Sequence, residues 1–292
     1  MEKCIFFGNL RQLKKNRSFK GYGRIYLGNE FCQRLIPAPA EVKQAVSFAG
    51  RRKLRFTLVT PYVTNAGLEK LSAILRALPG KSSIEVVVND WGVLDLVNRE
   101  FPRLVPVLGR LLTKQKRSPN LDLLLRRDLV APGIIPDPNN PSGKYLLLQK
   151  KFPPAADFYY QGSNASSVPL LQKFLLSKRI ARIELDNLAQ GMRLRLPAEG
   201  MAASVYLPYV YITTTFFCPT AAAFAQKGCL SRRPACRKQC RQYSFELAHP
   251  AFAGRPLYLK GNTQFYRNDR CDRGILKKLG INRIVYAPDL PF

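Results

Sequence analysis

Short apolar runs of strand length, each closed by turn residues, recur along the chain. RIYLG at 24–28 is the clearest of them, because it is apolar in its middle and ends at a glycine. The predicted strands cover residues 24–28, 54–59, 84–88, 104–108, 181–185, 204–213 and 283–286. Runs this short and this apolar are typical of strands that are buried on both faces of a sheet.

Helical patterns follow two of these strands. After 54–59, Asn65 is a candidate helix cap, and the apolar positions then recur at helical spacing: Leu68, Leu71, Ile74, Leu75 and Leu78. After 84–88, Asn89 and Asp90 lead into a second helical face formed by Val93, Leu94, Leu96 and Val97. Strands that alternate with helices indicate β–α units and a parallel sheet.

The number of strands and the missing motifs narrow the fold class. Six or seven strands in fewer than 300 residues favour an α/β fold of the TIM-like (β/α) barrel type, complete or distorted. A doubly wound nucleotide-binding sheet is disfavoured, because no GxGxxG follows the first strand and no GxxxxGK[ST] occurs. We therefore expect residues 1–292 to form one barrel domain, with a proline-rich loop or insertion around 118–154.

Charge is the strongest compositional signal. The chain has 47 Lys and Arg against 19 Asp and Glu, a formal net charge of +28, which favours a polyanionic partner such as RNA. A content of 46% hydrophobic residues supports a packed core and excludes disorder as the main state. With His249 as the sole histidine, a Ser-His-Asp hydrolase, an HExxH metalloprotease and a multi-histidine metal site are all disfavoured.

The location predicted from the sequence is the cytoplasm. The first residues lack the long apolar stretch and the cleavage site of a secretory signal. The longest apolar stretches, 202–212 and 215–225, are interrupted and too short to span a bilayer. Because cytoplasmic thiols stay reduced, the seven cysteines point to metal binding or reactivity before disulfides.

The cysteines are concentrated in one segment. Cys218, Cys229, Cys236 and Cys240 fall within 23 residues, and Cys32 lies four residues after the glycine that ends the first strand. Loops that follow the strands of a barrel all open on one face, so Cys32 and Cys218 are expected to meet there. Spacing leaves three readings open: zinc, an iron–sulfur cluster whose fourth ligand is distant, or buried cysteines that act as small hydrophobic side chains. The last of these fits Cys4 well.

Four segments together resemble the peptidase U32 family. They are IYLGNEFC at 25–32, VVVNDWG at 86–92, TTFFCPT at 214–220 with Cys236 and Cys240 downstream, and IVYAPD at 284–289. The matches extend over nearly the whole chain. Within that family, the four cysteines and the single-domain length are most similar to the small iron–sulfur subunits that take part in oxygen-independent ubiquinone hydroxylation.

The resemblance implies a TIM-like barrel with its Cys-rich segment at the C-terminal face of the strands. It also implies that one [4Fe–4S] cluster is held by Cys32, Cys218, Cys236 and Cys240. Cys229 has no counterpart in the family pattern and is an alternative ligand, and Cys271 is expected to pack or to lie on the surface. The resemblance does not cover the fifth strand, so no substrate-binding residue is carried over from there.

For function, the resemblance implies oxygen-independent hydroxylation of a ubiquinone precursor ring or of an RNA base, by a catalytic or an electron-transfer subunit. A partner subunit of the same family is implied too. The alternatives are an RNA-binding iron–sulfur module without catalysis and, last, a peptidase, for which His249 is the sole imidazole.

The RNA reading uses basic clusters and three aromatic residues as candidate contacts. The basic residues are Lys14, Lys15, Arg17, Lys20, Arg51, Arg52, Lys53, Arg55, Lys114, Lys116, Arg117, Arg232, Arg233, Arg237, Lys238 and Arg241, and the aromatic residues are Tyr243, Phe265 and Tyr266. Three other readings of the charge are that the basic runs are solvated faces, that they offset an anionic cluster, and that they dock on an acidic partner subunit.

Overall fold

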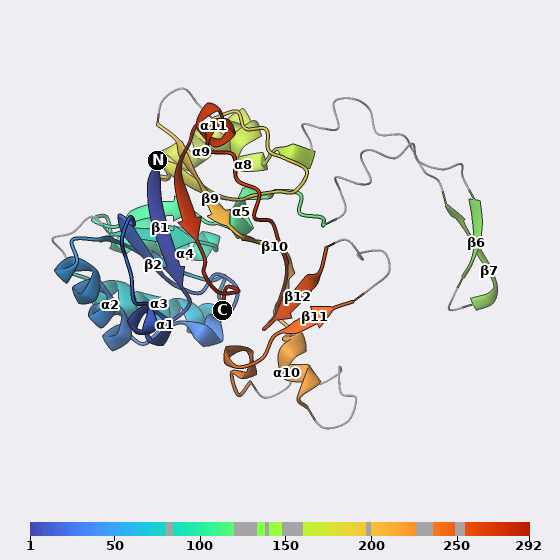
Figure 1. Cartoon of the computed structure of the whole chain (residues 1–292), viewed down its shortest axis with the longest axis horizontal. Helices are drawn as coiled ribbons and strands as arrows, with labels where there is room; N and C mark the ends of the chain where they lie inside the picture. Colours follow the sequence, from blue (N-terminus) through green and yellow to red (C-terminus); the bar gives the residue numbers. More distant parts are fainter. Residues whose placement is uncertain are drawn as a thin grey trace.

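Eight parallel strands form a closed barrel in the order β1-β14-β9-β8-β5-β4-β3-β2, with helices around it (Figure 1). The computed structural model describes residues 1–79, 84–119, 133–137, 140–147, 160–196, 200–225, 236–248 and 255–292. The barrel strands are β1 (Glu2–Phe7), β2 (Arg24–Gly28), β3 (Arg55–Val59), β4 (Glu85–Val88), β5 (Val105–Leu108), β8 (Arg182–Asp186), β9 (Ala202–Leu207) and β14 (Ile281–Tyr286). The predicted TIM-like barrel is therefore confirmed.

The helices of the outer layer connect successive barrel strands. They are α1 (Leu10–Lys15), α2 (Pro39–Arg51), α3 (Asn65–Arg76), α4 (Trp91–Glu100), α5 (Arg110–Thr113), α8 (Asn164–Ser167), α9 (Pro169–Ser177) and α11 (Arg273–Lys278). The helices predicted after the second and third predicted strands correspond to α3 and α4. Helix α3 begins at Asn65 itself, one residue after its cap Thr64. No helix within the described ranges has both the length and the apolar composition that a bilayer crossing requires.

Two strand predictions need correction. Strand β1 was not predicted, yet it closes the barrel by pairing in parallel with both β14 and β2. The single strand predicted over 204–213 is two strands, β9 and β10 (Tyr209–Thr214), because the chain turns at Pro208 and leaves the barrel. A strand pattern along the sequence does not reveal such a change of sheet, since both halves are apolar.

A second sheet follows this exit from the barrel. Its antiparallel order is β10-β13-β12-β11, with β11 at Phe245–Leu247, β12 at Leu257–Lys260 and β13 at Thr263–Arg267. Two short helical turns accompany it, α10 (Pro219–Ala223) and η2 (Gln239–Arg241), and they contact each other. The segment predicted as a loop or insertion, 118–154, contains the antiparallel hairpin of β6 (Gly133–Asp137) and β7 (Asn140–Leu147). Most of its other residues lie outside the described ranges.

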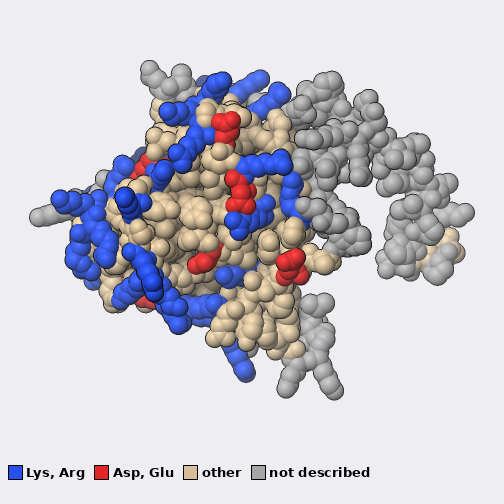
Figure 2. Space-filling model, viewed as in Figure 1, with Lys and Arg blue, Asp and Glu red and all other residues tan. Residues whose placement is uncertain are grey.

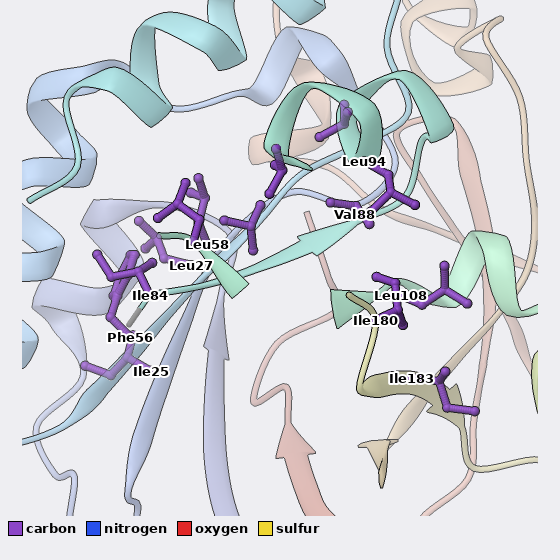
Figure 3. Packing of buried hydrophobic residues seen from close by; sticks show 14 of the residues in the cluster. Ile25, Leu27, Phe56, Leu58, Ile84, Val88, Leu94, Leu108, Ile180 and Ile183 are labelled. Carbon is purple, nitrogen blue, oxygen red and sulfur yellow. The ribbon is translucent and has the colours of Figure 1, made fainter. Parts of the chain in front are cut away.

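Alternation along each barrel strand separates two apolar layers. In β2, Ile25 and Leu27 point outward and pack in the layer between strands and helices, together with Leu58 of β3 and Leu94 of α4 (Figure 3). Tyr26, between them, belongs to a second cluster inside the barrel. The strands are thus buried on both faces, which explains why their sequences are almost continuously apolar.

Charged side chains fill the N-terminal end of the barrel. Arg283 of β14 donates hydrogen bonds to Glu85 at 2.6 Å, to Glu2 at 2.7 Å and to the Tyr26 hydroxyl at 2.8 Å. The Tyr26 hydroxyl in turn donates to Glu184 Oε1 at 2.9 Å. Glu184 is fully buried, and its Oε2 atom has no hydrogen-bond partner among the described residues. This carboxyl is therefore the incompletely paired member of the network.

We predict that Glu184 makes the protein less stable as pH rises from about 5 to 8. Burial raises the pKa of Glu184 from 4.5 to about 7, against the opposing effects of Arg283 and Arg182. Because the folded pKa lies above the unfolded value, the fold favours the protonated carboxyl. That stability is complete below pH 4.5 and is lost as pH rises to 7, by about 3 kcal/mol. Urea unfolding at pH 5 and pH 8 measures the loss.

The variant Glu184→Gln should remove most of this pH dependence, since a neutral amide mimics the protonated carboxyl. Glu100→Gln on the surface of α4 is the control and should keep it. Two other carboxyls of the network do not interfere: against the effect of burial, Arg24 and Arg283 lower the pKa of Glu2 and Glu85, so both titrate below this window. An unchanged slope in Glu184→Gln would contradict the prediction.

Candidate functional site

The four cysteines predicted as ligands lie together where the barrel meets the second sheet. Cys32 follows β2, Cys218 follows β10, and Cys236 and Cys240 lie on the segment that leads to β11. The charges of their thiolates influence one another in every pairing of the four. Cys32 and Cys240 also belong to the same cluster of packed side chains. Residues more than 180 positions apart in the sequence thus come within electrostatic range of one another.

The loop that carries Cys32 is fixed by two features of the first predicted motif. Gly28 has a φ of +140°, and a Cβ there would lie 2.0 Å from the carbonyl oxygen of Val59, so only glycine fits. The side chain of Asn29 is buried, and its oxygen accepts hydrogen bonds from the backbone N–H groups of Phe31 at 2.9 Å and Cys32 at 2.7 Å. These contacts turn the chain at Cys32, whose side chain packs with the cluster that includes Tyr211 and Phe265 of the second sheet.

Asn262, in the turn between β12 and β13, ties the two cysteine loops together. Its side-chain nitrogen donates to the Phe31 carbonyl at 2.8 Å, next to Cys32, and to the Thr215 carbonyl in the loop before Cys218. It also donates to the Tyr62 hydroxyl at 2.9 Å. The Cys218 sulfur accepts from a backbone N–H of α10 at 3.4 Å. Asn262 was not singled out in the sequence, because nothing local marks a side chain that bridges three distant segments.

Three of the four thiols, those of Cys32, Cys218 and Cys240, are held in their neutral form by burial. Burial raises the pKa of Cys240 to about 12, and the other three thiols contribute further. Burial likewise raises the pKa of Cys32 and of Cys218. A bound cation would stabilise the thiolates, so binding would release protons and strengthen with pH.

Across the residues that the structure describes, no group of three or more His, Cys, Asp or Glu side chains is arranged so that it could hold a single metal ion. The four cysteines are electrostatic neighbours in the structure and do not form such a group.

The other candidate residues lie elsewhere. Cys4 is fully buried among the side chains inside the barrel, and Cys271 is exposed, as expected for a residue outside the site. All the described cysteines are free thiols. Cys229, the alternative ligand, and His249, the sole imidazole, fall outside the described residues.

A buried ion network adjoins the quartet. Arg110, at the start of α5, is fully buried and donates to both carboxylate oxygens of Glu30 and, at 2.7 Å, to Asp186. Arg117 completes the network with a 2.5 Å hydrogen bond to Asp186. Glu30 lies two residues before Cys32, so the network fixes the base of that loop to the ends of β5 and β8. It was not predicted, because the partners are 69 to 80 residues apart.

The VVVNDWG motif has a structural explanation. The Asn89 side chain donates to the Thr60 carbonyl at 2.9 Å and accepts from the Leu111 N–H at 3.1 Å, which links three neighbouring loops. Asp90 caps α4 by accepting from the N–H groups of Gly92 and Val93. Both side chains are therefore used to shape the C-terminal face of the barrel.

The predicted RNA-stacking residues are wrong in two cases of three. Phe265 and Tyr266 are fully buried in β13, so neither ring is available to a base. Tyr243 is 47% exposed and contacts the ring of Phe224. Lys and Arg side chains do cover much of the visible surface, notably over α1 and α2, with few acidic side chains among them (Figure 2). The face in view is thus basic, and of the three aromatic residues predicted to stack on bases only Tyr243 is exposed.

Comparison with protein-family models, with curated proteins and with solved structures finds no match. The site is therefore interpreted from its own geometry and chemistry.

Proposed function

We propose that the chain is an iron–sulfur protein in which Cys32, Cys218, Cys236 and Cys240 hold one [4Fe–4S] cluster. The observation that carries the proposal is that these four cysteines, and neither Cys4 nor Cys271, come together at one end of the barrel. Their common property is a thiol that is buried or partly buried, in the connections between strands. Such a site suits a cluster that water and oxygen would otherwise attack.

The chemistry of the donor set supports this cofactor. Four thiolates without an imidazole or carboxylate suit soft metals, either zinc or the irons of a cluster, and the U32-like motifs favour the cluster. Arg34, beside Cys218, and Lys260, beside Cys240, supply positive charge near an anionic centre. When bound, the cluster supplies one-electron transfer. The four cysteines would occupy every iron, so direct binding of substrate to iron is disfavoured.

We further propose that the protein takes part in oxygen-independent hydroxylation of a ubiquinone precursor ring or an RNA base, in the reducing cytoplasm. Support comes from the U32-like motifs and from the quartet, whose residues match the family pattern. A partner subunit of the same family would share the reaction. A peptidase is the weaker reading, because cysteines that bind a cluster cannot serve as nucleophiles.

Anaerobic purification followed by iron and sulfide analysis tests the cofactor. We expect about four irons and four sulfides per chain, together with a broad brown absorbance that is lost on exposure to air or a chelator. One zinc ion per chain, or no metal at all, would refute the proposal.

The reaction can be tested separately in cells. A strain without the protein, grown without oxygen, should accumulate an unhydroxylated quinone precursor or lack a hydroxylated RNA base, as mass spectrometry would detect. The wild-type chain should restore the product, whereas Cys240→Ser should not. Normal levels of both products in the deletion strain would exclude the hydroxylation role while leaving the cofactor assignment intact.

A further inference from the structure

A cavity of about 620 Å³ opens at the C-terminal face of the barrel. Its walls come from the loops after β3, β4 and β5 and from strand β10 with the residues that follow it. This volume lies within the range of pockets that bind small molecules. None of the four cysteines is among the residues that line this cavity.

Three aromatic side chains line the cavity: Tyr62, Trp91 and Phe216. Phe216 is 68% exposed and Trp91 is 43% exposed, although large aromatic side chains usually gain free energy by burial. The rings of Tyr62 and Phe216 meet edge to face, with centroids 4.6 Å apart. Exposed rings around a concavity favour a ligand with a planar ring.

The cavity also carries positive charge. Lys114 and Lys116 are exposed on one wall, and Arg117 lies beside them. Asp90 is the one acidic side chain among the described lining residues, and backbone N–H groups of α4 already occupy one of its oxygens. The two lysines therefore favour a ligand with an anionic group.

The cavity lies next to the cysteine quartet. Tyr62 lines the cavity, and its hydroxyl donates to the Thr215 carbonyl at 2.8 Å. The same side chain is close enough to Cys32 and Cys218 to interact electrostatically with both. Phe216 is two residues before Cys218. The Tyr62 side chain is therefore shared between the wall of the cavity and the surroundings of Cys32 and Cys218.

We propose that this cavity binds a small molecule consisting of a planar aromatic ring that carries a carboxylate or a phosphate. The ring would pack against Trp91 and Phe216, and the anionic group would face Lys114 and Lys116. Binding depends on the cavity alone and not on the cluster, so it goes beyond the proposed function. The shared chemistry is a ring with an anionic group, whether it comes from an aromatic carboxylate or from a free nucleotide.

Trp91 is the single tryptophan of the chain, so its fluorescence reports on this cavity. We would titrate the full chain with benzoate, phenyl phosphate and uridine monophosphate, and confirm the affinities by calorimetry. Benzyl alcohol keeps the ring without the charge, and cyclohexanecarboxylate keeps the charge without the planar ring. At least one of the three ring anions should bind about tenfold more tightly than both controls. Which of the three binds best distinguishes a carboxylate from a nucleotide source.

Variants test which side chains are responsible. Lys114→Asn suits its left-handed backbone (φ of 54°), and Lys116→Gln removes the second charge; together they should weaken binding about tenfold. Phe216→Ala should weaken binding as well. Lys173→Gln on α9 and Phe224→Ala are the matched controls outside the cavity and should change nothing.

Several results would overturn the proposal. These are equal affinity for the ring anions and both controls, binding that Lys114→Asn/Lys116→Gln leaves intact, or binding of a decauridylate alone while no small ring anion binds. Cys240→Ser should retain ligand binding, because the cavity does not need the cluster. If the chain proved to bind no cluster, the prediction of ligand binding in the cavity would be unaffected. If no ligand bound in the cavity, the cluster assignment would likewise be unaffected.

Discussion

Replacing Arg110 with methionine is expected to lower the free energy of unfolding by about 3–5 kcal/mol, a large share of the stability of a typical domain. The guanidinium is fully buried and bonds Glu30, Asp186 and the Tyr209 carbonyl. Without it, Glu30 loses the guanidinium that bonds both of its carboxylate oxygens, and Asp186 keeps only Arg117. Leaving a buried charge without its partner is among the costliest single changes in a protein.

The matched control is Arg99→Met. Arg99 forms a 2.7 Å ion pair with Asp95 one turn earlier in α4, but both side chains are exposed, so about 0.5 kcal/mol or less should be lost. Urea unfolding of both variants measures the difference. The double variant Arg110→Met/Glu30→Gln should recover part of the loss, since it removes the stranded carboxylate. Equal effects of Arg110→Met and Arg99→Met would show that the buried network contributes no more than a surface pair.

The second large effect is expected at the cysteine quartet. Alanine at Cys32, Cys218, Cys236 or Cys240 should each abolish the brown chromophore and most of the bound iron, because a four-iron cluster depends on all of its thiolates. Iron analysis and visible absorbance after anaerobic purification measure the loss. If a single zinc ion were bound instead, all four variants would be colourless from the start, as would the wild type.

Two further variants serve as controls. Cys271→Ala should keep the cluster, since Cys271 is exposed and outside the quartet. Cys229→Ala should also keep it, as the family pattern implies. Loss of the chromophore in Cys229→Ala but not in Cys236→Ala would replace one ligand with the other and would correct the assignment. Circular dichroism of each variant separates loss of cofactor from loss of fold.

The barrel could be predicted from the sequence because parallel strands that are buried on both faces are almost continuously apolar. Each such run can be recognised from its own residues, without knowledge of the strand that it pairs with. Ile25 and Leu27 face the helices while Tyr26 faces the barrel interior, and all three are apolar enough to mark a strand. Strand β1 was missed because the apolar run at Cys4–Phe7 is short and a basic stretch follows it. Its role depends on pairing with β14 at the opposite end of the chain.

The site was predictable only in part, for a similar reason. The four cysteines could be singled out from the sequence because their residue type is rare and chemically specific, and the structure brings them near one another. Arg110, Glu30 and Asp186 are common residue types whose partners lie far away in the sequence, so their burial could not be read locally. The exposure of Phe265 and Tyr266 was predicted wrongly because β13 is buried on both faces. The sequence of an aromatic pair in a strand is the same whether the strand is buried or exposed to solvent.

The place of the second sheet in the chain has a consequence for biosynthesis. Strands β10 to β13, and with them Cys218, Cys236 and Cys240, lie between β9 and β14 in the sequence. A ribosome therefore completes all four cysteines before it has made β14, the strand that closes the barrel against β1. In the proposed iron–sulfur assignment, all four ligands would thus be available on a nascent chain whose barrel is still open.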